Sequence, residues 1–224
     1  MTRRIAILRP EPGNASTTQR VRDAGLEALP LPLFTMRPLD WTPPDPARFD
    51  GLLLTSANAL LHGGAGLAAL RALPVLAVGP TTADAARAAG FDVTLTGDSD
   101  VATLLREATG DTRLLWLAGR ERTAFDHPAL AATIAAYASD AQTITAADAT
   151  LLHDSVALVH SSRAARQLAA ELDRHAIPRG TVRIAAISPK VVEAAGSGWG
   201  AIAAAATPDD DALIAAAHRL AIDP

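Results

Sequence analysis

The chain has 224 residues, of which 49% are hydrophobic, and a formal net charge of −4 at pH 7. This length suits one large domain or two small ones, and the hydrophobic fraction indicates a packed core rather than disorder. Cysteine is absent, which excludes disulfides, thiolate metal sites and cysteine nucleophiles. We find no basic block typical of nucleic-acid binding, no apolar stretch that spans a bilayer and no signal-peptide pattern, and we expect a cytoplasmic protein.

Short apolar runs bounded by turn residues recur along the chain. In order they are RIAILR (4–9), GLLLTS (51–56), PVLAVG (74–79), RLLWLA (113–118), VALVHS (156–161) and VRIAAI (182–187). They are continuously apolar rather than alternating, as strands buried on both faces of a parallel sheet are. Alanine-rich helical windows separate them, such as TADAARAAG (82–90) and SRAARQLAAELDRH (162–175). The sequence therefore predicts an α/β fold with parallel sheets, of the flavodoxin or Rossmann-like kind.

The chain also repeats itself. AVGPTTADAARAAGF (77–91) is echoed by AAISPKVVEAAGSGW (185–199), and DGLLLTSANAL (50–60) by DSVALVHSSRA (154–164). The start, RRIAILRPEPG, is similar to TRLLWLAGRER at 112–122. An offset of roughly 104 to 111 residues indicates two copies of one α/β unit, because solenoid repeats are shorter.

Two extended segments, 31–50 and 141–154, separate the copies and suggest a two-stranded hinge between two lobes. Simple tandem order would place residues 1–110 in one lobe, whereas the alternative nests the second lobe inside the first. The repeat period leaves both arrangements open. The stretch LAATIAAYASD (130–140) reads as a helix, on which Tyr137 has a packing role.

Ligands of an open parallel sheet bind beyond the carboxyl ends of its strands, so the residues there are the first candidates. Gly79-Pro80-Thr81-Thr82 begins a helix, with Thr81 and Asp84 in a capping-box arrangement. Ser188-Pro189-Lys190 is the downstream copy. Free backbone N–H groups at such helix starts attract carboxylates. Plain helix capping, and a solvated lysine at position 190, are the alternatives.

Other strand ends carry further polar residues. Thr55-Ser56-Ala57-Asn58 and Ser161-Ser162 offer hydroxyl and N–H donors, or they are simple helix caps. Arg9 and Arg120 end the first strand and its copy, where a guanidinium suits a carboxylate ligand or a surface ion pair. The six histidines show no metal-ligand spacing, and no nucleotide-binding or nucleophile motif occurs. We therefore expect no metal and no cofactor.

The order and spacing of these motifs resemble the uroporphyrinogen-III synthase family over nearly the whole chain. The stretches that carry the resemblance are AILRP, LPLPLFTMRPLD, FDGLLLTSANAL, LAVGPTTADAARAAGFDVT, VALVHSSRAARQL and RIAAISPKVVEAAG. The resemblance implies the nested topology, with residues 1–36 and 150–224 in one lobe and 40–147 in the inserted lobe. It also implies the substrate, hydroxymethylbilane, a linear tetrapyrrole with many carboxylates. The family removes its terminal hydroxyl as water, inverts the last pyrrole ring through a spirocyclic intermediate and closes the macrocycle.

The resemblance extends to site residues. Thr82 matches a family threonine and is the predicted catalytic residue. The predicted substrate-binding residues share positions at strand ends or helix starts; they are Arg9, Thr55, Ser56, Asn58, Gly79, Thr81, Arg120, Ser161, Ser162, Ser188 and Lys190. The family usually has a tyrosine on the extended crossing between the lobes, which assists the leaving hydroxyl. Alignment from Leu130 through Ile134 puts that place near Ala146 or Ala147, so the role is not given to Tyr137.

Two features keep a second interpretation open: the missing tyrosine, and Ser188 to Val191 in place of the family's downstream motif. These features are also compatible with a non-catalytic, two-lobed binder of a tetrapyrrole or another acidic small molecule. In either case we expect a monomer that binds a small polycarboxylate and neither nucleic acid nor membrane.

Overall fold

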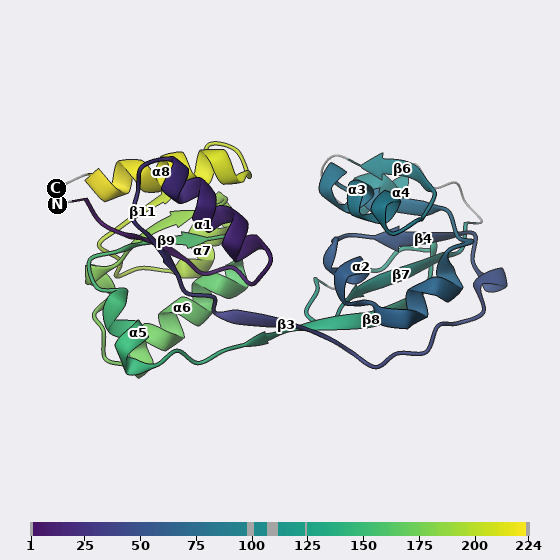
Figure 1. The fold of residues 1–224 in the computed structure, drawn as a ribbon, viewed down its shortest axis with the longest axis horizontal. Helices are drawn as coiled ribbons and strands as arrows, with labels where there is room; N and C mark the ends of the chain where they lie inside the picture. Colours follow the sequence, from purple (N-terminus) through teal and green to yellow (C-terminus); the bar gives the residue numbers. More distant parts are fainter. Residues whose placement is uncertain (1, 98–100, 107–111, 124, 223–224) are drawn as a thin grey trace. The chain divides into compact units, whose positions relative to one another are not determined.

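A computed structural model describes residues 2–97, 101–106, 112–123 and 125–222 (Figure 1). The chain forms two compact units, unit 1 with Met1–Thr35 and Asp140–Pro224, and unit 2 with Met36–Ser139. Unit 2 is thus inserted into unit 1, and the chain crosses between them twice. The return crossing comes earlier than the sequence placed it, because residues 140–147, expected in the inserted lobe, belong to unit 1.

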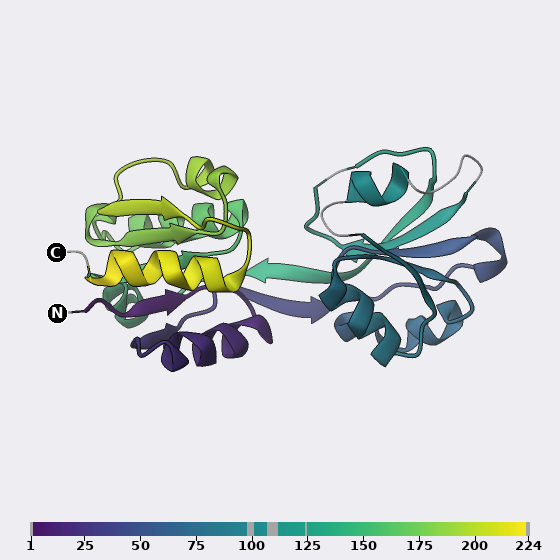
Figure 2. The same cartoon turned by 90° about the horizontal axis from the view of Figure 1, so that it is seen from above.

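Unit 1 is built on a five-stranded parallel sheet with the order β11-β10-β9-β1-β2. Its strands are β1 (Ile5–Ile7), β2 (Ala28–Pro30), β9 (Val156–Val159), β10 (Arg183–Ala186) and β11 (Ala201–Ala204). Its helices are α1 (Gly13–Asp23), α5 (Ala146–Leu151), α6 (Ser162–Arg174), α7 (Pro189–Ala195) and α8 (Asp210–Ile222). The helices α5, α6 and α7 cover one face of the sheet, and α1 and α8 cover the other (Figure 1, Figure 2). Their buried side chains form one core cluster on each face.

Unit 2 is built on a six-stranded sheet with the order β3-β8-β7-β4-β5-β6. Its strands are β3 (Phe34–Pro38), β4 (Gly51–Leu54), β5 (Val75–Val78), β6 (Val93–Gly97), β7 (Leu114–Gly119) and β8 (Leu130–Ala141). The helices α2 (Asn58–His62) and α3 (Pro80–Ala88) pack on one face, and α4 (Val101–Arg106) packs on the other. None of the helices in the described ranges is long and apolar enough to cross a membrane.

The central strands are buried along their whole length, as their continuous apolar sequences predict. Every residue of β1, β4, β7 and β9 is buried, and successive side chains alternate between the two faces of each sheet. Covering both faces with helices is what makes such uninterrupted apolar strands stable. The predicted α/β fold with parallel sheets is confirmed.

The stretch LAATIAAYASD is a strand, so the predicted helix over residues 130–140 is wrong. It forms most of β8, which pairs in parallel with β7 through Leu115–Ala132 and Leu117–Ile134. On its other side β8 neighbours β3, and the Leu39 N–H donates to the Ala136 carbonyl oxygen at 2.9 Å. Alanine favours a helix locally, but pairing on both edges outweighs that small preference. Tyr137 therefore lies on an extended strand.

The returning chain is fixed to unit 1 by a buried carboxylate. Glu171 of α6 is fully buried, and its Oε2 accepts a hydrogen bond from the Ile144 backbone N–H at 3.1 Å. The Gln167 amide donates to Glu171 Oε1 at 3.1 Å and to the Gln142 carbonyl oxygen at 3.0 Å. Arg174 Nη2 lies 3.3 Å from Glu171 Oε1. A buried carboxylate is tolerated only when its hydrogen bonds are made, so Glu171 specifies the path of residues 142–144.

We predict that Glu171→Ala lowers the free energy of unfolding by about 2 to 4 kcal/mol, because it leaves the Ile144 N–H and the Gln167 amide without their acceptor. Urea unfolding followed by circular dichroism measures this. Glu193→Ala, which removes an exposed carboxylate from α7, is the matched control and should change stability by less than about 0.5 kcal/mol. Equal stability of the two variants would contradict the anchoring role.

Candidate active site

The unit 2 candidates from the sequence lie at the carboxyl ends of adjacent strands. Thr55 to Asn58 follow β4, Gly79 to Thr82 follow β5, and Arg120 follows β7. In the sheet β4 lies between β5 and β7, and all three strands are parallel. The three stretches therefore share one edge of the sheet, which is where ligands of such sheets bind.

The start of α3 differs in detail from the predicted capping box. Gly79 is the N-cap residue, with φ of 82°, and no side chain caps the helix. Because that φ is strained for any residue with a Cβ, glycine is required there. Thr81 is exposed and Thr82 is buried within the first turn, while Asp84 pairs with Arg87 at 3.0 Å on the surface. The capping box of Thr81 and Asp84 is therefore wrong, and the helix starts without a side-chain acceptor.

The residues after β4 have partners within unit 2. Thr55 Oγ1 accepts a hydrogen bond from the Trp116 indole N–H at 3.3 Å. Ser56 Oγ accepts the Asn58 backbone N–H at 3.2 Å, at the residue where α2 begins. The Ser56 side chain also lies close enough to the phenol of Tyr137 to lower its pKa by hydrogen bonding. Ser56 thus links the β4 edge to β8.

Tyr137, the one tyrosine of the chain, is half-buried at this edge. Its ring lies against the end of β7: a Cβ built on Gly119 would be 2.9 Å from the ring atoms Cε2 and Cζ and 3.1 Å from the hydroxyl oxygen. The Arg120 backbone N–H donates to the Tyr137 carbonyl oxygen at 2.8 Å. The imidazole of His62 lies at a centroid distance of 6.2 Å from the phenol ring. The ring is held from several sides and its hydroxyl is next to Ser56.

Three effects set the protonation of this phenol. Burial raises the pKa of Tyr137, the hydrogen bond from Ser56 opposes that rise, and the negative charge of Glu121 adds to it. The net direction is upward, so Tyr137 is protonated at neutral pH and has a proton to donate. Burial also acts to raise the pKa of Glu121, but the Ser139 backbone N–H at 2.8 Å and the Arg120 guanidinium outweigh it and lower that pKa. Glu121 therefore stays charged beside the phenol.

The unit 1 candidates also follow adjacent parallel strands, β10, β9 and β1. Ser161 is the N-cap of α6, and its Oγ accepts the Ala164 N–H at 3.1 Å. The Ser162 hydroxyl donates to the Lys190 carbonyl oxygen at 3.5 Å. Ser188 is the N-cap of α7 without a side-chain hydrogen bond, and Lys190 is exposed. Their roles in substrate binding stay predictions.

Arg9 is paired within unit 1. Its Nη1 lies 3.1 Å from Asp210 Oδ2 and donates to Thr17 Oγ1 at 3.2 Å. Asp210 also accepts from Thr17 at 2.9 Å, and it lies 3.1 Å from His160 Nε2 and 3.3 Å from Arg20 Nη1. The hydrogen bond with His160, against the opposing effect of burial, holds the pKa of Asp210 far below its usual range, with Thr17 and Arg9 adding to this. This cluster joins the end of β1 to the start of α8.

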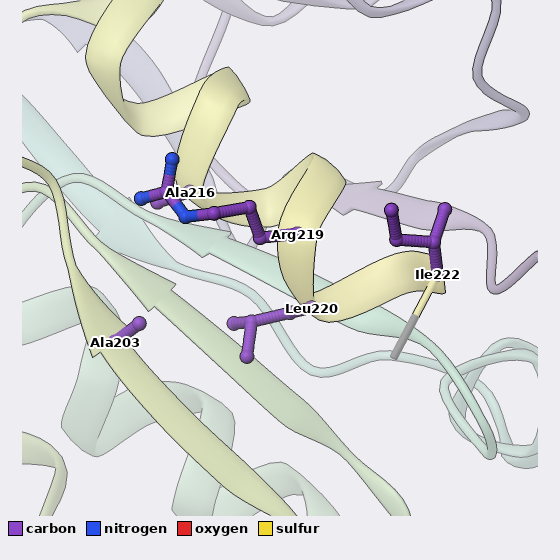
Figure 3. Close-up of a pocket in the computed structure, with 5 residues that line it drawn as sticks. All are labelled: Ala203, Ala216, Arg219, Leu220 and Ile222. Atoms are coloured by element: carbon purple, nitrogen blue, oxygen red, sulfur yellow. The ribbon is translucent and has the colours of Figure 1, made fainter. Parts of the chain in front are cut away.

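A cavity of about 410 Å³ lies elsewhere in unit 1, between β11 and the C-terminal half of α8. Figure 3 shows the side chains that line it: Ala203, Ala216, Arg219, Leu220 and Ile222. The Leu220 carbonyl oxygen accepts a hydrogen bond at 2.8 Å from Arg183, the first residue of β10. The cavity is therefore near the amino ends of the strands, away from the candidate site. Among the described residues, no group of three or more histidine, aspartate or glutamate side chains could hold a metal ion.

These observations define a class, the two-unit α/β proteins in which one parallel-sheet unit is inserted into another and polar residues gather at the carboxyl edges. Within that class, the family model for uroporphyrinogen-III synthase HemD matches residues 15–215. The chain belongs to the uroporphyrinogen-III synthase family, whose members are cyclising lyases.

Solved structures support the fold. The chain is similar to the uroporphyrinogen-III synthetase of Helicobacter pylori, with a TM-score of 0.67 and 15% identity over 97% of this chain and 99% of that one. It is also similar to a mutant uroporphyrinogen III synthase of Thermus thermophilus, with a TM-score of 0.53 and 15% identity over 96% of this chain and 97% of that one. A search of curated protein sequences gave no match.

Sequence reasoning missed Tyr137 because it placed the residue on a helix. Once β8 is recognised as a strand, Tyr137 lies on the extended segment that leads back into unit 1, whereas Ala146 and Ala147 begin α5. The repeat gave no signal for this strand, because α1 lies between β1 and β2 in the first copy, whereas β8 is the element that follows β7 among the described residues. Asp210 and His160 carried no motif that could have identified them.

We predict that the phenol of Tyr137 titrates above its ordinary pKa, because burial and the charge of Glu121 disfavour the anion. Since no other tyrosine is present, the phenolate absorbance of the folded protein reports this residue alone. Glu121→Gln should lower the pKa, because it removes the neighbouring negative charge. Asp92→Asn, at an exposed position at the start of β6, should leave it unchanged. An ordinary pKa in the wild type would show that the ring is solvated.

We also predict that Arg9→Ala lowers the free energy of unfolding by about 1 to 3 kcal/mol, because it removes a charged partner of Asp210. The control Arg22→Ala removes an exposed side chain of the same helix region and should be neutral. Thermal and urea unfolding provide the measurement. If stability is unchanged and the substrate KM rises instead, Arg9 binds a substrate carboxylate as the sequence suggested.

Proposed function

We propose that this chain converts hydroxymethylbilane to uroporphyrinogen III, with inversion of the last pyrrole ring and loss of water. The observation that carries the proposal is the environment of Tyr137, a protonated phenol on β8 at the carboxyl edge of the unit 2 sheet. Membership of the family supports the reaction, and the position of Tyr137 on the extended return segment supports its role as proton donor.

The reaction requires that the bilane be oriented more than that it be activated. The bilane is intrinsically reactive and closes without a protein to the isomer whose last ring is not inverted. The protein must therefore hold the chain so that the substituted carbon of the last ring attacks first, which is work for binding contacts. It must also help hydroxide to leave, because the bond between carbon and oxygen breaks only as oxygen gains a proton.

In the proposed step Tyr137 donates its proton to the departing hydroxyl, which leaves as water. The electron pair on the pyrrole nitrogen stabilises the resulting cation, and the last ring then attacks and rearranges through the spirocyclic intermediate. The final loss of a proton from a ring carbon returns one proton to the phenolate, so the protein ends unchanged. The hydrogen bond from Ser56 stabilises the phenolate during this interval, which is the effect seen in its opposition to the raised pKa.

The carboxylates of the bilane are proposed to bind at the carboxyl edges of the two sheets. The first turn of α3, at Gly79 to Thr82, suits one of them, because no side chain caps that helix and its N–H groups favour an anion. Thr82, buried in that turn, keeps its proposed catalytic role. The other proposed contacts are those of the sequence prediction: Arg9, Thr55, Ser56, Asn58 and Arg120, with Ser161, Ser162, Ser188 and Lys190.

A monomer that acts in the cytoplasm, without a membrane or nucleic-acid partner, stays a prediction. The second interpretation is a non-catalytic binder of an acidic small molecule. No finding favours it over the enzyme.

An isomer assay tests the proposal. Freshly generated hydroxymethylbilane should give mainly isomer III with the protein and isomer I without it. Equal isomer I in both reactions, with the bilane nonetheless bound, would favour the non-catalytic binder.

We predict that Tyr137→Phe lowers kcat at least about tenfold, because a positioned proton donor contributes a factor of this size or larger. KM should change little, since the ring and its packing remain. The variant should unfold at the same temperature as the wild type, which is checked by circular dichroism. An unchanged kcat would remove Tyr137 from the chemistry and leave hydroxide departure to another group.

A further inference from the structure

His62 is the last residue of α2 and contacts the ring of Tyr137. The two ring centroids are 6.2 Å apart and the planes are inclined by 39°, a tilted arrangement within the range of favourable aromatic pairs. The backbone of Gly119 also approaches the phenol so closely that a Cβ there would stand 2.9 Å from ring carbons. The phenol ring therefore has two close neighbours, His62 and Gly119, and its hydroxyl interacts with Ser56.

The imidazole of His62 is partly buried, and one of its nitrogens is covered. His62 Nε2 is buried and has no hydrogen-bond partner among the described residues. Leaving a buried polar atom unpaired costs stability, so packing alone would favour a phenylalanine or leucine at this position. This nitrogen is covered, and the aromatic neighbour of the imidazole is the Tyr137 ring.

The end of α2 is itself fixed in place. The Trp41 indole N–H donates to the Gly63 carbonyl oxygen at 2.9 Å, directly after His62. The same indole ring lies against Gly66, where an added Cβ would be 2.7 Å from it. Because the end of α2 is held in place, the His62 imidazole has a fixed position. A fixed neighbouring ring restricts the positions that the Tyr137 phenol can take.

We propose that His62 is a positioning residue for Tyr137, which holds the phenol ring against the end of β7 so that its hydroxyl keeps one direction. This rests on the proposed role of Tyr137 as proton donor. The side chain supplies shape and not a proton, so a ring of similar size without nitrogen should replace it. The general cost of a poorly positioned acid is a loss in kcat, because the ground-state contacts with substrate remain.

The test compares His62→Ala with His62→Phe, each in the wild type and in Tyr137→Phe. His62→Ala should lower kcat about 3- to 10-fold, the size expected from losing one aromatic contact, with KM within about twofold. His62→Phe should restore kcat to within about twofold of the wild type. In the Tyr137→Phe background, His62→Ala should have no further effect, because the two residues act as one unit. His218→Ala, exposed on α8, is the control histidine.

A second readout does not depend on turnover. Biosynthetic fluorotyrosine labels Tyr137 alone, and its single fluorine NMR resonance should shift or broaden in His62→Ala but not in His218→Ala. Should His62→Ala fail to fold, Gly119→Ala provides a second test, because its Cβ displaces the ring while its backbone needs no positive φ. It should lower kcat in the wild type and have no effect in Tyr137→Phe.

The outcomes separate the two ideas. A slow Tyr137→Phe together with a fully active His62→Ala overturns the positioning role and leaves the proposed function intact. A fully active Tyr137→Phe overturns the proton-donor role on which both depend. Additive losses in the double variant would show that His62 acts independently of Tyr137 and would also overturn the inference.

Discussion

The pairing of β8 on both of its edges is the constraint on which the candidate site depends. Its first half pairs with β7 inside the unit 2 sheet, and its second half lies beside β3 where the chain returns to unit 1. One continuous strand thus joins the unit 2 sheet to the crossing. Tyr137 lies where the part of β8 paired with β7 meets the part beside β3. Because side chains on a strand alternate, the pairing register with Gly119 decides which way the phenol points.

Opposing effects act on the pKa of the Tyr137 phenol. Burial and the charge of Glu121 hold the proton on Tyr137, whereas the hydrogen bond from Ser56 favours its release. The first two effects make the phenol a weaker acid, and the third partly offsets them. Their balance suits a group that must lose a proton once and regain it in each turnover. Glu121 can serve because Arg120 and the Ser139 N–H keep it charged.

The strands that are buried on both faces could be predicted from sequence. The strand β8 and the start of α3 could not, because residues distant in sequence or the backbone conformation decide them. Continuous apolar runs identified β1, β4, β7 and β9 because strands covered on both faces need nothing else. The run from Leu130 to Ala141 failed because its alanines favour a helix slightly, while the neighbours that make it a strand lie far away in sequence. The capping box failed in the same way: Thr81 and Asp84 had the right spacing, but Gly79 with its positive φ started the helix earlier.

The two arginines show why a charge at a strand end cannot be assigned from its position alone. Arg9 and Arg120 end equivalent strands in the duplicated units, and each is paired with a carboxylate of its own unit, Asp210 in one case and Glu121 in the other. The two carboxylates come from different places, one from the first turn of α8 and the other from the residue next in sequence. In each unit the arginine is paired with a nearby carboxylate, because a charged hydrogen bond stabilises a guanidinium at the end of a buried strand. A substrate carboxylate at either position must compete with that internal partner, which makes the uncapped start of α3, where no side chain competes, the more favourable place for an anion.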